Sequence, residues 1–169
     1  MTKWTGLGCV LMGVCAMAQG ELAYKKIEVL ADGSASAQPY LAFPAVLDLG
    51  EDILVSYKRG RSHAGDPDAV LEMMRIDGKT GRGHEPKTLA HVEGKIMQMG
   101  EWVRFPNGDI ATYIDAQQKG NPQRIGLMGV RSSDGGKTFG PVERLGVVDG
   151  VEYGYAFEAL SENKTTWML

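Results

Sequence analysis

Short runs of alternating or continuous apolar residues, separated by turn residues, recur along the whole chain. Runs of this kind, bounded by Gly, Asn, Asp and Lys, are typical of β-strands. The clearest are 52–58 (DILVSYK), 69–76 (AVLEMMRI), 108–115 (GDIATYID), 124–133 (RIGLMGVRSS) and 165–169 (TTWML). Runs with helical periodicity are scarce. The pattern therefore predicts an all-β fold.

The strand pattern repeats along the chain with a constant offset. The recurring segments are 49–57 (LGEDILVSY) with 106–114 (PNGDIATYI), and 75–81 (RIDGKTG) with 132–139 (SSDGGKTF). Asp52 and Asp77 recur as Asp109 and Asp134, and both offsets are 57 residues. A unit of this length with roughly four antiparallel strands is typical of a β-propeller blade.

The period divides the chain into blade units at about 40–92, 93–150 and 151–169, of which the third is incomplete. A propeller closes with about four to eight blades, and the chain holds about two and a half. We therefore expect the N-terminal part of a longer propeller. A complete small β-sandwich of similar length is the alternative.

The first residues read as a secretory signal. Lys3 provides the positive charge, residues 4–15 form a short apolar stretch, and Ala16 and Ala18 give the small-x-small cleavage pattern. This predicts a signal peptide at 1–18 and export to the periplasm or the extracellular medium. An uncleaved N-terminal anchor is the alternative. No later segment is apolar for long enough to cross a membrane.

Charge and cysteine content narrow the function classes. The formal net charge of −3, with 43% hydrophobic and 23% charged residues, lacks the basic excess of a nucleic-acid binder. Cys9 and Cys15 both lie in the predicted signal, which excludes disulfides and thiol chemistry from the mature chain. His63, His84 and His91 show no metal-binding spacing, so no metal or other cofactor is expected.

The segment 131–140 (RSSDGGKTFG) contains Gly-Lys-Thr but fits no phosphate loop, because Arg131 stands where a P-loop needs its first glycine. It lacks the carboxylates of a calcium loop. It matches the Asp-box, Ser/Thr-x-Asp-x-Gly-x-Thr-Trp/Phe, through Ser132, Asp134, Gly136, Thr138 and Phe139. We expect Asp134 to accept backbone N–H bonds across the turn and Phe139 to enter the core. The segment 75–81 is a degenerate copy.

The run 41–66 (LAFPAVLDLGEDILVSYKRGRSHAGD) resembles the first blade of the sialidase (neuraminidase) superfamily. In this superfamily, Asp-box (BNR) repeats occur in a six-bladed β-propeller. Pro44-Ala45, Gly60-Arg61 and Asp66 match the family motif, and the resemblance covers about 38–169. It implies a glycoside hydrolase that acts on glycans, with Asp66 as general acid/base and Arg61 binding a sugar hydroxyl.

One departure from the family pattern bears on the substrate. Ala42 stands where the family has the first of the three arginines that bind the sialic acid carboxylate. The departure implies a different substrate, a replacement such as Arg59, or loss of activity. Asp115, after the equivalent strand of the second unit, is a further candidate for substrate binding. The family's tyrosine–glutamate nucleophile pair is expected in later blades.

Each candidate also has a structural interpretation. Asp66 and Arg61 lie in a polar loop, where an aspartate before proline often shapes a turn. His63 could contact a ligand or simply be exposed, and Trp102 could stack on a sugar or belong to the core. We therefore expect an exported sialidase-like glycoside hydrolase with a glycan partner. The alternatives are a non-catalytic propeller that binds a glycan or a protein, and a purely structural repeat protein.

Overall fold

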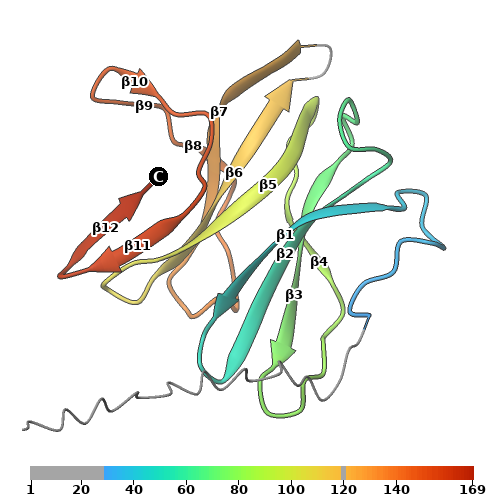
Figure 1. The fold of residues 1–169 in the computed structure, drawn as a ribbon, viewed down its shortest axis with the longest axis horizontal. Helices are drawn as coiled ribbons and strands as arrows, with labels where there is room; N and C mark the ends of the chain where they lie inside the picture. The colour runs from blue at the N-terminus through green and yellow to red at the C-terminus, as the bar shows by residue number, and fades with distance from the viewer. Residues whose placement is uncertain (1–28, 119–120) are drawn as a thin grey trace, which may run out of the picture.

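The protein is built from antiparallel β-sheets (Figure 1). The computed structural model describes residues 29–118 and 121–169, which contain strands, turns and loops but no helix. The predicted signal peptide lies outside these residues. The predicted all-β fold is confirmed.

Two sheets of four strands follow each other along the chain, and in each the strands lie in chain order. The first comprises β1 (Tyr40–Asp48), β2 (Asp52–Gly60), β3 (Val70–Asp77) and β4 (Lys87–Ala90). The second comprises β5 (Lys95–Arg104), β6 (Ile110–Gln118), β7 (Asn121–Ser132) and β8 (Glu143–Arg144). All paired neighbours are antiparallel.

Side chains alternate between the two faces of the first sheet, as a strand requires. Along β2, Leu54, Ser56 and Lys58 lie on the face toward the second sheet and are fully buried. Tyr57 and Arg59 lie on the opposite face. Lys58 therefore stands in phase with core residues, which is unusual for a lysine.

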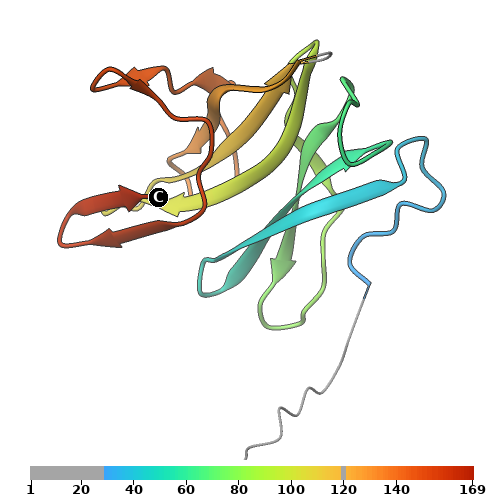
Figure 2. The same cartoon turned by 45° about the horizontal axis from the view of Figure 1, so that its top comes forward.

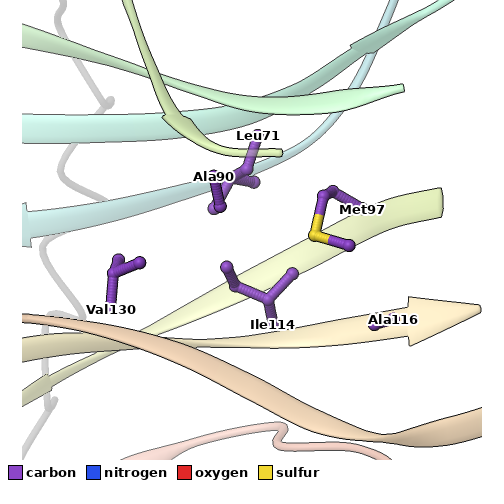
Figure 3. Close-up of a cluster of buried hydrophobic side chains, with 6 residues drawn as sticks. All are labelled: Leu71, Ala90, Met97, Ile114, Ala116 and Val130. Carbon is purple, nitrogen blue, oxygen red and sulfur yellow. The ribbon is translucent and has the colours of Figure 1, made fainter. Parts of the chain in front are cut away.

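Two apolar clusters hold the sheets together. In the first (Figure 3), Leu71 and Ala90 of the first sheet face Met97, Ile114, Ala116 and Val130 of the second. The second cluster joins Leu54 and Met73 to Trp102 and Ile110. Phe139 packs against both clusters, and its ring centroid lies 6.0 Å from that of Trp102. Burial of this apolar surface is the main stabilising contribution between the sheets.

The Asp-box turn connects β7 to β8. Its aspartate, Asp134, accepts hydrogen bonds from the backbone N–H groups of Lys137 and Thr138, both at 3.0 Å, and from the Thr138 hydroxyl at 2.6 Å. The Ser132 hydroxyl donates to Asp134 at 2.7 Å. In the degenerate copy after β3, Asp77 accepts the Thr80 N–H at 2.7 Å. In both turns, one aspartate carboxylate thus accepts hydrogen bonds from several nearby donors.

Each sheet contains an arginine–aspartate ion pair at the equivalent position. Arg75 of β3 pairs with Asp52 of β2 at 2.6 Å, and Arg131 of β7 pairs with Asp109, just before β6, at 2.7 Å. Arg75 additionally donates to the carbonyl of Gly135 at 2.8 Å, which links the first sheet to the Asp-box turn of the second. The sequence repeat is therefore visible as a repeat of contacts.

Two hairpins follow the second sheet. One joins β9 (Val147–Val148) to β10 (Val151–Glu152), and the other joins β11 (Ala159–Glu162) to β12 (Thr165–Met168). Strand β5 lies beside β1 on one side and beside β11 on the other (Figures 1 and 2). The first strands of the successive units are thus neighbours.

Candidate functional site

The loop 61–69, between β2 and β3, brings Arg61 and Asp66 together. The Asp66 carboxylate accepts the backbone N–H of Arg61 at 2.5 Å and that of Asp68 at 3.2 Å. The Arg61 guanidinium lies 3.7 Å from Asp66 and 2.9 Å from Asp68. The Asp66 side chain is only 2% exposed, whereas that of Arg61 is 57% exposed. The loop therefore presents the cation to solvent and holds the carboxylate inside.

Gly60 makes room for this arrangement. A Cβ atom at Gly60 would approach Oδ2 of Asp66 to 2.8 Å and the Cβ of Ala69 to 3.1 Å. Because real Cβ atoms do not approach so closely, a side chain here would displace the carboxylate. The Gly-Arg step at the end of β2 is thus needed to seat Asp66 over the strand.

Lys58 links this loop to the second sheet. Its ammonium group donates to the carbonyl of His63 at 2.8 Å and to the side-chain oxygen of Gln98, on β5, at 2.7 Å. Gln98 in turn donates to Gln117 of β6 at 3.3 Å. Burial lowers the pKa of Lys58, and the nearby charge of Asp66 partly opposes this. We call Lys58, Arg61, His63, Asp66, Gln98 and Gln117 the Lys58 cluster.

Arg59 lies away from the Lys58 cluster. It is on the opposite face of β2 and pairs with Glu72 of β3 at 2.8 Å. Tyr57 lies on the same face, and burial together with Glu72 raises the pKa of Tyr57 to about 12. The structure therefore places Arg59 on the face of β2 opposite to Lys58, and Lys58 is the residue paired with Ala42.

The residue opposite Ala42 in the β1–β2 ladder is Lys58. Directly paired residues of antiparallel strands project to the same face, with Cβ atoms about 5 Å apart. A buried cation therefore stands next to the position where the sialidase resemblance expects an arginine.

The other predicted residues are placed as follows. Asp115 is buried on β6, two positions before Gln117, at the end of the strand that reaches the Lys58 cluster. Trp102 is 4% exposed and packs in the core, which leaves no free ring face for a sugar. His63 is exposed, and its ring accepts or donates a hydrogen bond with the Tyr40 hydroxyl at 2.9 Å.

The sequence interpretation missed Lys58 and Gln98. The sequence could have indicated the burial of Lys58. It lies two and four positions after Ser56 and Leu54 in β2, so the alternation of the strand puts all three side chains on the buried face. Gln98 carried no signal. It lies in β5 where the pairing register shifts between Met97 and Gly100, which breaks the alternation.

Within residues 29–118 and 121–169, no group of three or more His, Cys, Asp or Glu side chains is placed to hold a metal ion. No helix in the same part of the chain is long and apolar enough to cross a membrane.

Comparisons with known proteins bear on the fold only. No protein-family model matches the chain, and no curated protein matches it either. A crystal structure of a protein of unknown function from Dyadobacter fermentans DSM 18053 is similar, with a TM-score of 0.51 and 18% identity. The match covers 73% of this chain and 44% of that one, so this chain corresponds to less than half of its neighbour.

Proposed function

We propose that this chain belongs to an exported, sialidase-like glycoside hydrolase whose glycan-binding site is the Lys58 cluster. The observation that carries the proposal is the meeting of Arg61 and Asp66, the residues that match the family motif, at one end of the first sheet. Behind this pair, the buried side chains of Lys58 and Gln98, from β2 and β5, add a cation and an amide. Polar groups of this kind, converging from several strands, suit the recognition of sugar hydroxyl or carboxylate groups.

A propeller architecture is part of this proposal. It is supported by two consecutive four-stranded antiparallel sheets that share the Arg–Asp ion pair and the Asp-type turn. The adjacency of β1, β5 and β11 also supports it, because the first strands of successive blades lie side by side around a propeller axis.

In the hydrolytic mechanism, Asp66 is the general acid/base. It would donate a proton to the leaving-group oxygen and then remove one from the attacking water. Arg61, exposed beside it, would bind a sugar hydroxyl. Opening of the loop 61–69 is required, because Asp66 must reach the glycosidic oxygen within hydrogen-bond distance.

A second candidate function is non-catalytic binding of a glycan or a protein by the same propeller. The burial of Asp66 favours it, since both carboxylate oxygens already accept backbone N–H groups. Ala42 favours it as well, because an alanine cannot bind a substrate carboxylate.

Hydrolysis of aryl glycosides, with and without sialic acid, tests the catalytic role of Asp66. If Asp66 is the acid/base, Asp66→Asn lowers turnover by about 100-fold or more, the usual contribution of general acid–base catalysis. Asp68→Asn is the matched control, because Asp68 lies in the same loop and contacts the same arginine but is 58% exposed. It should change turnover only a few-fold.

Circular dichroism checks that both variants are folded. Undiminished turnover in folded Asp66→Asn would contradict the assignment of Asp66 as the general acid/base. Absence of turnover in the wild-type protein, combined with glycan binding in calorimetry, would select the non-catalytic function instead.

A further inference from the structure

Strand β1 contains a bulge at Phe43 and Pro44. The ladder with β2 pairs Ala42 with Lys58 and resumes with Ala45 and Ser56, so the two residues between them interrupt the pairing. Bulges of this kind redirect side chains and are common beside functional sites.

Phe43 adopts a backbone conformation that its side chain disfavours. Its φ is 54°, in the left-handed region that costs energy for any residue with a Cβ atom. Phe43 also precedes a proline, which restricts a residue further toward extended conformations. Strain at a bulky residue persists only where the surroundings impose it, and it is concentrated at binding and catalytic sites. The contacts of the Phe43 ring therefore indicate what the strained conformation provides.

The bulge places the Phe43 ring against His63. The two ring centroids are 5.2 Å apart, with an edge-type interplanar angle of 62°. His63 also contacts the Tyr40 ring, at 6.1 Å and 82°, and its Nδ1 lies 2.9 Å from the Tyr40 hydroxyl. Tyr40 and Phe43 thus both contact the His63 ring in edge geometry, and we call Tyr40, Phe43 and His63 the aromatic platform.

The aromatic platform adjoins the Lys58 cluster. Tyr40 is paired with Gly60, and the Gly60 backbone lies against the Asp66 carboxylate. The Lys58 ammonium group lies 5.8 Å from the centroid of the Tyr40 ring. His63 belongs to both groups. The loop that carries His63 also exposes the charged side chains of Arg61 and Asp68.

We propose that the aromatic platform binds the apolar face of a pyranose ring, next to the hydroxyl- and charge-binding groups of the Lys58 cluster. This deepens the proposed function and rests on it, since it takes the ligand to be a glycan. A sugar ring has one face of C–H groups and a rim of hydroxyl groups. The exposed ring of His63, with Tyr40 and Phe43 edge-on beside it, fits the face, and the exposed guanidinium group of Arg61 fits the rim. A protein partner would need a much larger surface, on the order of 800 Å² from this side.

Two variants of Phe43 separate binding from packing. Phe43→Leu keeps an apolar side chain and removes the ring. Phe43→Gly removes the ring and also relieves the left-handed strain. The control is Phe157→Leu, because Phe157 is 71% exposed, stacks on another aromatic ring and lies in a different part of the structure.

The test is saturation-transfer NMR on the full chain, with methyl galactopyranoside and the methyl glycoside of N-acetylneuraminic acid as probes. Mannitol, a polyol without a ring face, is the negative probe. We expect transfer to the ring C–H protons of at least one glycoside and none to mannitol. Phe43→Leu should weaken that binding by about threefold to tenfold, as removal of an aromatic contact does. Phe157→Leu should leave the binding unchanged.

Thermal unfolding supplies the second readout. If the strain at Phe43 is retained for a ligand, Phe43→Gly melts at or above the wild-type temperature while its glycoside binding falls. A clear fall in melting temperature assigns the ring to packing and overturns the proposal. So does unchanged binding in Phe43→Leu, or the absence of transfer to either glycoside in the wild-type protein.

The Phe43 and Asp66 experiments test different proposals. If hydrolysis depends on Asp66 but not on Phe43, the hydrolase proposal holds and the aromatic platform is not a sugar-binding site. If glycoside binding depends on Phe43 but the protein has no turnover, the aromatic platform binds sugar and the hydrolase proposal is wrong.

Discussion

Asp134 shows how a single carboxylate organises a turn. Hydrogen bonds from the side chain and backbone of Thr138, and from the Ser132 hydroxyl, lower the pKa of Asp134 from its ordinary value of 3.8. A carboxyl group whose pKa is lower in the folded protein contributes stability above its unfolded pKa. That contribution is lost as the pH falls through the folded value.

Asp134→Asn should therefore destabilise the protein at neutral pH, because an amide loses the charge that these donors favour. The difference from wild type in the free energy of unfolding should be constant above about pH 5 and shrink below about pH 4. Urea unfolding over this pH range measures it. Glu85→Gln is the control, since it removes the same charge from an exposed side chain. A difference that stays constant down to pH 3 would contradict the assignment.

At the scale of elements, the turn between β7 and β8 contains two successive glycines in different surroundings. Gly135 has φ 72° and Gly136 has φ 76°, so both need the left-handed region. A Cβ at Gly135 would meet nothing within 4 Å, whereas one at Gly136 would approach Leu54 to 2.8 Å and Ile110 to 2.9 Å. Only the second glycine lets the turn close onto the core between the sheets.

Gly135→Ala and Gly136→Ala separate backbone strain from packing. Both pay about 1–2 kcal/mol for a Cβ in the left-handed conformation. Gly136→Ala should lose a further 1–3 kcal/mol, roughly the cost of overpacking a core. Chemical denaturation of the two variants gives the comparison directly. Equal losses would mean that the turn moves away from the core without cost.

Most long strands could be predicted from the sequence, among them β7, whose pairing with β6 contains register shifts, but β5 could not. The run 52–58 falls within β2 and the run 69–76 overlaps β3, because both runs are rich in apolar residues and are bounded by turn residues. Strand β5 was missed, since its register shift between Met97 and Gly100 places small and polar residues in the pattern. The sequence signal for a strand is local composition and periodicity, and it weakens where small and polar residues interrupt the apolar run.

The same limit applies to the candidate site. Arg61 and Asp66 are five residues apart in one loop, so a sequence motif can carry their relation. The Lys58–Gln98 bond joins residues 40 positions apart, on different sheets. It depends on the register of β5 against the first sheet, which no local pattern encodes.

At the scale of the whole molecule, apolar side chains are unevenly exposed. The large hydrophobic residues of β9 to β12 and their loops lie open to solvent, including Val147, Val151, Phe157, Leu160, Trp167 and Leu169. Leu160 and Trp167 are directly paired in the β11–β12 hairpin, and each is 60% exposed. Exposed apolar surface of this kind on a two-stranded hairpin favours association.

We expect the chain to self-associate through the β11–β12 hairpin. Burial of one large apolar side chain contributes about 1.5–3 kcal/mol. Trp167→Lys should therefore weaken association by about tenfold or more, in sedimentation velocity over a range of concentrations. Val46→Lys is the control, because Val46 is 62% exposed but lies on β1. If both variants associate like the wild type, the hairpin is not the contact. If only Val46→Lys dissociates, the outer surface of the first sheet is the contact instead.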